Sequence, residues 1–576
     1  MDPIRYTLSF PAPHTHYVHI RAEVPAAGRD SVELSMAVWT PGSYLVREFS
    51  RHVESVTAES PGGIALRVEK TAKNRWRVAT GGALMVIVSY RVYGREMSVR
   101  TNWIESDFAF VNGAPTFLTL AGPSTALGAG ESARPHEVSI VPASGWTRSI
   151  TALEPAVRPK PDTTAPHTYC APDYDTLVDS PILIGNPELY EFSVDGVPHV
   201  LANAGDTTFF DSSRVVKDLE AIVRAHKEFW GSFPYQRYVF INLLTEAGGG
   251  LEHARSSVLM ASRWSTRTRK AHLRWLELAS HELFHAWNVK RLRPIELGPF
   301  DYEREVFTPS LWVVEGITDY YGDVLVLRAG RSSAQEFLDS LSDKIEELQT
   351  TPGRAVRSVT QASMDAWIKL YRPDENTPNT AISYYTKGAV VAFLLDAKIR
   401  RATGGRRSLD EVMREAYARY SATHGFTPDE FRTLTEHVAG IDLGAFWRTA
   451  IEGTEELDYS EALEVFGLQF RPANGSPNGK PKAWIGATTK IDAGRLIVAQ
   501  VKRDTPAFGA GLNVDDEIVA IDQVRVRTDR LDERLEQYTP GDRISLLVAR
   551  RDRLLSLNLV FGVEPPRTWR LEPRPA

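Results

Sequence analysis

The chain has 576 residues, of which 43% are hydrophobic and 24% charged, an ordinary composition for a globular protein. This length exceeds what one hydrophobic core can organise, so roughly three or four domains are expected. The net charge of −6, with acidic and basic residues interspersed, disfavours a nucleic-acid-binding protein, and the single cysteine, Cys170, excludes an intrachain disulfide.

The first ten residues, MDPIRYTLSF, lack the basic region and apolar run of a signal peptide. No run of about 18 apolar residues occurs anywhere in the chain, so no transmembrane helix and no membrane partner are predicted. We therefore expect a cytoplasmic protein, although a chain whose signal peptide had been removed would read the same way and would be periplasmic.

Residues 1–150 predict β-structure. The segments YTLSF, YVHIRAEV and LMVIVSYRVYG alternate apolar and polar residues or are rich in β-branched residues, and Gly, Pro and Asp clusters separate them. This pattern favours a β-sandwich-like domain. The proline-rich stretch EPAVRPKPDTTAP at 154–166 predicts a linker or an exposed loop.

Helical periodicity begins at about residue 211. The segment SSRVVKDLEAIVRAHKEFWG predicts an amphipathic helix that ends near Gly231, and RYVFINLLTE predicts a buried strand after it. Long helices are predicted around 270–290 and 310–328, and further helices follow to about 455. These residues predict one mostly helical domain.

A second linker is predicted at 471–483, where the sequence is RPANGSPNGKPKA. Short strand patterns such as RLIVAQVK and RISLLVARR follow it, together with two short helix candidates. The end of the chain therefore predicts a small, mainly β module.

A candidate metal site lies in the predicted helix at 270–290, which contains His281-Glu282-Leu283-Phe284-His285. Helix positions i and i+4 lie about 40° apart, so both imidazoles can reach one Zn²⁺ at roughly 2.0–2.1 Å. Glu282 is then placed to act on a water molecule as general base. The alternative is a chance match that involves two ordinary histidines.

A third ligand is predicted in the next helix, because catalytic zinc takes three protein ligands and keeps one open position. Glu315 lies in the apolar segment LWVVEGITDYY, where a carboxylate is costly to bury unless it is paired or bound to a metal. Asp319, one turn later, is placed to accept the free ring N–H of a liganding histidine. The alternative is an acidic first turn that the helix dipole favours.

Two other segments could complete a peptidase site. In GGGLEH (248–253) the residues Gly249 and Gly250 would let a substrate backbone approach, and Glu252 could pair with a free α-amine. In SYYTKG (383–388) a tyrosine hydroxyl could stabilise an oxyanion. Taken alone, the first segment would favour a flexible loop and the second a pair of packing tyrosines.

These segments together resemble the glycyl aminopeptidase family, a branch of the gluzincin metallopeptidases related to aminopeptidase N. The resemblance is carried, in family order, by WTPGSYLVREFSRHV, DSPILIG, GGGLEH, HELFHAWNVKRLRP, WVVEGITDYY and YYTKG. It implies that Glu315 is the third ligand, Tyr385 the oxyanion-stabilising tyrosine and Glu252 the amine anchor. Related enzymes have a shorter gap before the third ligand, and Glu303 and Glu305 lie nearer that spacing, but in a loop-like context.

The resemblance also implies a multidomain α+β protein with an N-terminal β domain (1–175), a thermolysin-like catalytic domain (176–465) and a linker with a C-terminal PDZ domain (466–576). TPAFGAGLNVDDEI (505–518) resembles the bacterial PDZ pattern, with Asp515 at a position where Gly is usual. WIGA (484–487) resembles a carboxylate-binding loop, so a C-terminal peptide is a possible partner beside the peptide substrates.

The expected function is therefore a zinc-dependent aminopeptidase with one Zn²⁺ per chain. The family implies a preference for a small first residue, Gly or Ala. Two alternatives stay open: an endopeptidase with the same metal site, in which Glu252 is structural, and a PDZ scaffold with a vestigial metal site.

Overall fold

The computed structural model describes residues 1–121, 134–156, 167–421, 425–471, 482–565 and 568–575. Most of the two predicted linkers, 154–166 and 471–483, lies outside the described residues. Within the described part of the chain, no helix is long and apolar enough to cross a membrane.

The internal contacts of the chain define two compact units, and each is described by itself. The first unit comprises Met1–Thr308, Tyr321–Ser333 and Asp410–Leu434, and the second comprises Pro309–Tyr320, Ala334–Leu409 and Thr435–Ala576. The three predicted sequence domains, 1–175, 176–465 and 466–576, follow a different criterion and stay predictions.

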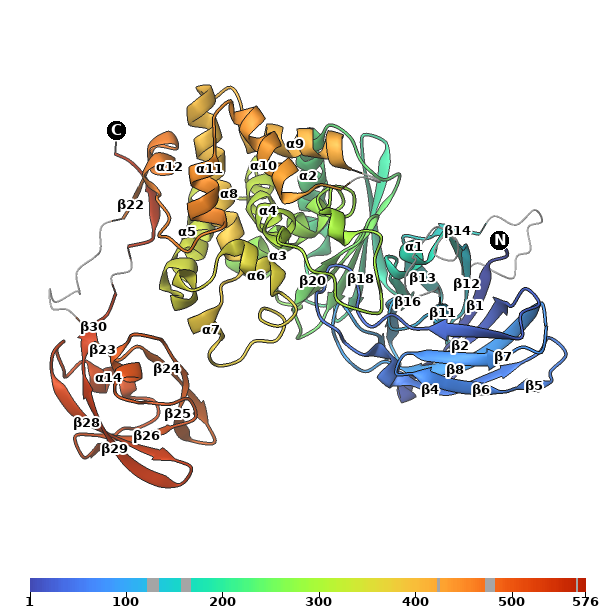
Figure 1. The fold of residues 1–576 in the computed structure, drawn as a ribbon, viewed down its shortest axis with the longest axis horizontal. Coiled ribbons are helices and arrows are strands. Elements are labelled where there is room, and N and C mark those ends of the chain that lie inside the picture. Colours follow the sequence, from blue (N-terminus) through green and yellow to red (C-terminus); the bar gives the residue numbers. More distant parts are fainter. Residues whose placement is uncertain (122–133, 157–166, 422–424, 472–481, 566–567, 576) are drawn as a thin grey trace. The chain divides into compact units, whose positions relative to one another are not determined.

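The first unit begins with a β domain, drawn in blue to teal in Figure 1, whose largest sheet has eight strands. Only the pair β1 and β12 is parallel. In spatial order the strands are β14 (Glu154–Pro155), β15 (Thr168–Ala171), β12 (His136–Val141), β1 (Ile4–Ser9), β2 (Tyr17–Pro25), β8 (Met85–Tyr93), β4 (Val53–Glu59) and β5 (Ala65–Leu66).

Two four-stranded sheets complete this domain. One contains β11 (Thr119–Leu120), β3 (Ser31–Ser35), β7 (Arg75–Ala79) and β6 (Val68–Ala72), and the other contains β13 (Arg148–Thr151), β16 (Ile182–Gly185), β10 (Phe108–Val111) and β9 (Trp103–Ile104). Alternate residues of β2 are buried, as a sheet with one face against a core requires. The predicted N-terminal β domain is confirmed.

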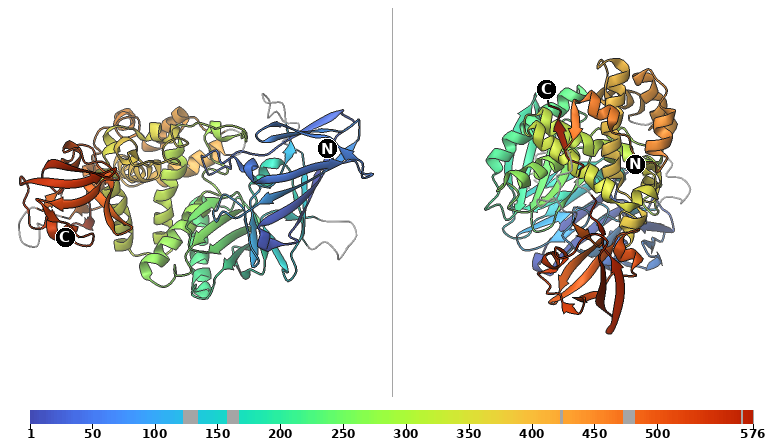
Figure 2. Two further views of the ribbon diagram at one scale, coloured as in Figure 1. Left: turned by 90° about the horizontal axis from the view of Figure 1, so that it is seen from below. Right: turned by 90° about the vertical axis from the view of Figure 1, so that its left-hand side faces the viewer.

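The first unit continues with a further sheet of five strands, which Figure 2 shows in green from two further directions. Its strands are, in spatial order, β17 (Glu188–Val194), β18 (Val197–Gly205), β19 (Tyr238–Leu244), β21 (Ser256–Ala261) and β20 (Gly249–Glu252). Within the described residues, β20 pairs only with β21 and so forms one edge of this sheet. One face of the sheet packs on Phe108 and Phe110 of β10.

Helices pack against the β17–β21 sheet. In α2 (Ser212–Trp230) the Asp211 side chain caps the N-terminus and Gly231, in a left-handed conformation, ends the helix as predicted. In α3 (Arg269–Phe284) Thr268 caps the N-terminus. The unit also contains α1 (Tyr174–Val178), most of α4 (Ile317–Arg328), of α9 (Leu409–Tyr420) and of α10 (Pro428–Ala439).

The helix predicted around 270–290 ends earlier than expected, at Phe284. Beyond it the backbone carbonyls find other partners: Asn288 O accepts from Nδ1 of His285 at 2.8 Å, and Ala286 O accepts from Arg291. Val289 then takes a positive φ of 113°, which breaks the helical path. His285 itself keeps helical dihedral angles, so the i, i+4 relation to His281 survives.

The second unit contains helices on either side of the predicted tyrosine segment. They are η4 (Trp312–Gly316), a π-helical turn that leads into α4, and then α5 (Ala334–Thr350), α6 (Val359–Met364), α7 (Thr377–Thr380), α8 (Tyr384–Thr403), α11 (Gly444–Phe446) and α12 (Ser460–Val465). The middle of α8 is buried on all sides, from Lys387 to Ala397, which explains its long apolar run.

The second unit ends with the predicted small β module, drawn in red in Figure 1. Its sheet contains β24 (Ala487–Asp492), β25 (Arg495–Val501), β26 (Glu517–Ile521), β27 (Val524–Arg525), β28 (Arg543–Arg550) and β29 (Arg553–Val560), with the short helices α13 (Pro506–Gly509) and α14 (Leu531–Leu535). Asp515 adopts a φ of 68°, so the turn keeps the left-handed geometry that Gly usually provides.

Candidate functional site

The two predicted histidine ligands face one another at the end of α3. Nε2 of His281 and Nε2 of His285 lie 3.1 Å apart. Nδ1 of His285 lies 2.8 Å from Asn288 O, and because a carbonyl can only accept, Nδ1 carries the proton and Nε2 presents a lone pair. Two ring nitrogens this close need a proton or a cation between them.

This geometry fits a metal ion. Two Zn–N bonds of about 2.05 Å at a tetrahedral angle would separate the nitrogens by roughly 3.3 Å. One ligand atom from each of His281, His285 and Glu315 lies within 4.8 Å of the other two. Two imidazoles and a carboxylate are a ligand set that catalytic zinc sites use.

The surroundings of Glu315 show why this carboxylate is held firmly. Glu315 is 2% exposed and lies in the π-helical turn η4, a local irregularity that is frequent at functional sites. Its neighbour Gly316 lies against α8: a Cβ at Gly316 would be 2.5 Å from Cα of Gly388. The glycine pair lets η4 and α8 approach closely, and sequence reasoning gave neither glycine a role.

The same close approach brings Glu315 near Tyr385. Burial, and after it the negative charge of Glu315, raise the pKa of Tyr385 well above its ordinary value of about 10. The phenol therefore keeps its proton at neutral pH and can donate a hydrogen bond. Tyr384 is fully buried, whereas Tyr385 is partly exposed, which distinguishes the two adjacent tyrosines.

Glu282, the predicted base, is buried beside the glycine-rich edge strand β20. Its side chain is 5% exposed, and a Cβ on Gly250 would collide with its carboxylate oxygen Oε1. Glycine at position 250 is therefore required by the close approach of β20 to α3, in addition to any role in substrate binding. This contact joins two of the predicted motifs, GGGLEH and HELFH.

Glu252 ends strand β20 and is 4% exposed. Its oxygen Oε1 is buried and has no hydrogen-bond partner among the described residues. One carboxylate oxygen each of Glu252 and Glu282 lies, together with a ring nitrogen of His285, within a group whose atoms are at most 4.8 Å apart. Two buried carboxylates at this separation favour a cation between them.

A turn of the N-terminal β domain, at Gly42, lies against the carboxylate of Glu252. Gly42, with a φ of 85°, lies so near that a Cβ there would be 2.6 Å from Oε2 of Glu252. Gly42 belongs to the WTPGSYLVREFSRHV segment, and the structure gives this segment a physical role, because its glycine permits the close approach.

Asp179 fixes the turn that follows Glu252. Its Oδ2 accepts from Ala254 N at 2.7 Å, and its Oδ1 accepts from Nδ1 of His253 at 3.1 Å and from Nζ of Lys290 at 2.8 Å. The carboxylate therefore connects the β20–β21 turn with the segment that follows α3. Sequence reasoning noted the DSPILIG stretch but assigned Asp179 no role.

The other acidic residues near the metal motif have different partners. Oδ2 of Asp319 lies 3.2 Å from Nζ of Lys344. Nδ1 of His285 donates its hydrogen to Asn288 O. The predicted bond from a liganding histidine to Asp319 stays a prediction. Glu303 lies nearer in sequence to the zinc motif, close to the shorter spacing of the third ligand in related enzymes. Its carboxylate forms an ion pair with Arg75 of the β domain.

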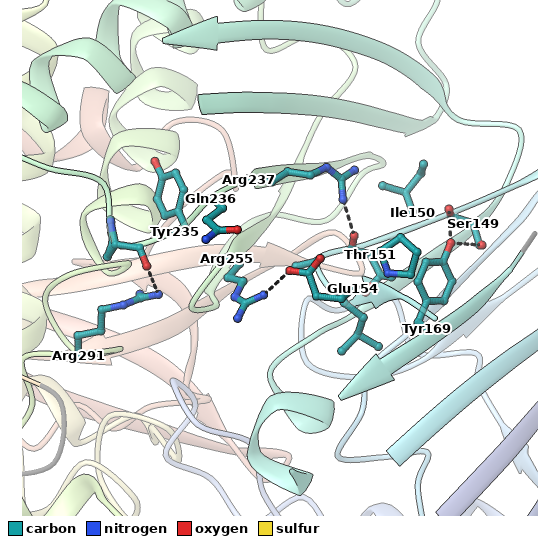
Figure 3. A pocket seen from close by; sticks show the side chains of 14 residues that line it. Ser149, Ile150, Thr151, Glu154, Tyr169, Tyr235, Gln236, Arg237, Arg255 and Arg291 are labelled. Atoms are coloured by element: carbon teal, nitrogen blue, oxygen red, sulfur yellow. Dashed lines mark hydrogen bonds and ion pairs between the residues drawn. The ribbon is translucent and has the colours of Figure 1, made fainter. Parts of the chain in front are cut away.

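A cavity of 560 Å³ in the first unit, shown in Figure 3, contains none of the predicted site residues. Three arginines line it, Arg237, Arg255 and Arg291, and Oε1 of Glu154 accepts from Arg255 at 2.7 Å. Arg291 donates to the carbonyls of Pro234, Ala254 and Ala286. Arg291 therefore serves to hold the backbone around the candidate site.

Comparisons with known proteins bear on the whole chain. A model described as the Peptidase M61 N-terminal domain matches residues 5–186, one described as M61 glycyl aminopeptidase matches 274–391, and one for a PDZ domain matches 465–560. The solved structure of an aminopeptidase N family protein from Idiomarina loihiensis is 30% identical, with a TM-score of 0.90 over 99% of this chain and 98% of that chain.

A second solved structure, an M1 zinc metallopeptidase from Deinococcus radiodurans, is 14% identical, with a TM-score of 0.48 over 79% of this chain and 95% of that chain. No curated protein sequence matches the chain. The fold and the site together define a metallopeptidase with an N-terminal β domain and a C-terminal PDZ domain.

The chain belongs to the M61 glycyl aminopeptidase family. The resemblance, the fold class and the enzyme class predicted from the sequence are confirmed.

Proposed function

We propose that the chain is a zinc-dependent aminopeptidase that hydrolyses the first peptide bond of its substrates. The observation that carries this proposal is the buried Oε1 of Glu252, which lacks a hydrogen-bond partner among the described residues and lies in one cluster with Glu282 and His285. A buried acceptor of this kind is costly unless a donor reaches it. The α-ammonium group of a peptide supplies both the donor and the opposite charge.

One zinc ion per chain would be held by His281, His285 and Glu315. The facing Nε2 atoms, 3.1 Å apart, and the common cluster with the buried Glu315 support this assignment. When bound, zinc lowers the pKa of a water molecule towards about 7 and polarises the peptide carbonyl. Three protein ligands would leave the metal accessible to a water molecule and to the substrate.

Glu282 and Tyr385 carry the remaining chemistry. Glu282 takes a proton from the attacking water and delivers it to the nitrogen of the leaving amine, so the carboxylate is regenerated. Tyr385, whose raised pKa keeps it protonated, donates its O–H to the oxygen that becomes negative in the transition state. Asp319 is proposed to accept a hydrogen bond from the free ring N–H of a liganding histidine and so to orient that ring.

The substrate backbone is proposed to lie along Gly249 and Gly250, at the edge of the sheet. Edge strand β20 offers main-chain groups for pairing, and its glycines leave space beside them. Because Glu252 ends this strand, the substrate amine lies at one end of the groove, and Gly250, next to Glu282, lies beside the bond to be broken.

A direct test compares substrates with free and blocked amino groups. A charge-assisted bond to Glu252 contributes about 1.5–3 kcal/mol, so acetylation of alanine p-nitroanilide should lower kcat/KM by roughly tenfold to a hundredfold. Glu252→Gln, which keeps the shape of the side chain, should remove most of this difference and retain zinc. Equal cleavage of both substrates by the wild-type protein would instead support an endopeptidase and leave Glu252 structural.

Two finer features belong to the same proposal. Family membership supports a small first residue, glycine or alanine, which a series of aminoacyl anilides would test. The PDZ domain is proposed to accept a peptide C-terminus at the segment 484–487, where Ile485 O already accepts from Ala507 N at 2.8 Å. Binding of a labelled C-terminal peptide library to the full chain would test the proposed PDZ ligand. A chain that binds such peptides but hydrolyses no aminoacyl anilide would be a scaffold and would contradict the proposed peptidase.

A further inference from the structure

Arg100 of the β domain lies beside the proposed substrate groove. Its Nη1 is 4.0 Å from the position that a Cβ on Gly249 would occupy. Its Nε is buried without a hydrogen-bond partner, and no ion pair of its guanidinium occurs among the described residues. A partly buried guanidinium without a partner is expensive to keep, and it is suited to bind a carboxylate.

The loop that carries Arg100 is held rigidly. The Nδ2 group of Asn112 donates to the carbonyls on both sides of Arg100, to Val99 O at 3.3 Å and to Thr101 O at 2.7 Å. Val99 itself is 1% exposed and packs in the core between the β domain and the β17–β21 sheet. The backbone that carries the Arg100 side chain is therefore fixed before any ligand binds, as a preorganised site requires.

The direction of a bound substrate follows from the proposed function. The amine lies at Glu252, and the bond to be broken lies beside Gly250, which contacts Glu282. The chain beyond that bond must then continue towards Gly249. At about 3.4 Å per extended residue, three residues span about 10 Å, which is also the distance from residue 252 to residue 249 along the strand. The carboxylate of a tripeptide would then lie beside Gly249, whose empty Cβ position is 4.0 Å from Nη1 of Arg100.

We propose that Arg100 binds a carboxylate on the leaving side of the substrate, and that the site is built for short peptides, tripeptides above all. This inference rests on the proposed aminopeptidase function and names its substrate class. The carboxylate can come from the C-terminus of a tripeptide or from an aspartate side chain at the third position of a longer peptide. The bidentate fork of arginine suits either source.

The test uses binding and turnover together. Binding of Ala-Ala-Ala and of Ala-Ala-Ala-amide to the zinc-loaded Glu282→Gln protein is measured by calorimetry, and kcat/KM for both is measured with the active enzyme. Ala-Ala-Ala should bind roughly tenfold to a hundredfold more tightly than Ala-Ala-Ala-amide. In turnover, the two peptides should differ mainly in KM and little in kcat. Arg100→Met should remove the preference, and Arg100→Lys should retain part of it.

The matched control is Arg95→Met, which removes the same charge from the same domain. Arg95 is partly exposed and pairs with Glu105 at 3.6 Å, so its loss should leave the acid-to-amide ratio unchanged. Ala-Ala-Asp-amide distinguishes the two carboxylate sources. It should bind as tightly as Ala-Ala-Ala only if the aspartate side chain can replace the C-terminal carboxylate at Arg100. Circular dichroism and thermal unfolding establish that each variant is folded.

Several results would overturn the inference. They are a wild-type acid-to-amide affinity ratio below about threefold, or a folded Arg100→Met protein that keeps the full wild-type ratio. Hydrolysis of alaninamide, which is too short to reach Arg100, reports on the proposed function separately. If the wild-type protein hydrolyses alaninamide but shows no preference for the acid over the amide, only the role of Arg100 is refuted, whereas absence of alaninamide hydrolysis by the wild-type protein refutes the aminopeptidase.

Discussion

Replacing Asp179 by asparagine tests how the turn beside Glu252 is held. The Asp179 carboxylate accepts three hydrogen bonds, from Lys290, His253 and Ala254 N, at 2.7–3.1 Å. An asparagine of the same shape loses the negative charge and directs an N–H group at one of these donors. The variant should therefore loosen the β20–β21 turn and leave the Lys290 ammonium without this counter-charge.

The size of the effect follows from burial. The Lys290 side chain is 8% exposed, His253 is 2% exposed and Asp179 is 20% exposed. Breaking a fully buried ion pair costs about 3–5 kcal/mol. Because Asp179 retains some contact with water, we expect a smaller loss of about 2–4 kcal/mol in the free energy of unfolding. The same change should lower kcat/KM for substrates with a free amine, because Glu252 loses its support.

The assay is urea unfolding, followed by tryptophan fluorescence, at a series of pH values. Burial is the largest influence on the pKa of Asp179 and acts to raise it, but Lys290 and His253 outweigh burial and lower the pKa. Because the pKa of Asp179 is lowered in the folded state, the ionised carboxylate stabilises the protein fully above the ordinary pKa of about 4. This stabilisation decreases progressively below pH 4 and is lost only as the pH falls through the lowered folded-state pKa. The difference between wild type and variant should therefore be full at pH 7 and shrink below about pH 4.

The matched control is Glu54→Gln. Glu54 pairs with Arg91 at 2.7 Å, but both side chains are 41% exposed, so the loss of stability should be much smaller than that of Asp179→Asn. If Asp179→Asn changes the free energy of unfolding by no more than this control, or if its effect is as large at pH 2 as at pH 7, the electrostatic explanation of the turn is wrong.

Three further substitutions test individual roles. Glu282→Gln should retain zinc, measured by elemental analysis, and lose roughly 10²–10⁴-fold in kcat; loss of zinc would mean that Glu282 is a ligand. Tyr385→Phe should lower kcat far more than it raises KM, and a larger effect of Tyr384→Phe would shift the assignment by one residue. Gly250→Ala should abolish turnover because its Cβ collides with Glu282, whereas Gly248→Ala, whose nearest neighbour would be 3.9 Å away, should be tolerated.

Features encoded locally could be predicted from the sequence. The helix α2 was predictable because its apolar periodicity and its final Gly231 lie within twenty residues of one another. The HExxH pair was predictable for the same reason, since i and i+4 positions share a face of any helix. The end of α3 was missed, because it depends on the bond between Nδ1 of His285 and Asn288 O, which only the folded turn creates.

Features made by distant segments could not be read from the sequence. Asp179 acts on His253 and Lys290, which lie 74 and 111 residues away, and no spacing rule connects them. Gly42 reaches Glu252 and Arg100 reaches Gly249 only because the β domain packs on the β17–β21 sheet. Such contacts depend on tertiary packing, for which a single sequence carries no local signal.

The central claim is that a zinc ion and a free substrate amine are both required for hydrolysis. The most direct measurement is the rate of alaninamide and N-acetylalaninamide hydrolysis by protein that has been stripped with a chelator and then titrated with Zn²⁺. The account predicts no hydrolysis without metal, full recovery at about one zinc per chain, and a rate for the acetylated substrate at least tenfold lower. Activity without metal, or equal rates for both substrates, would contradict it.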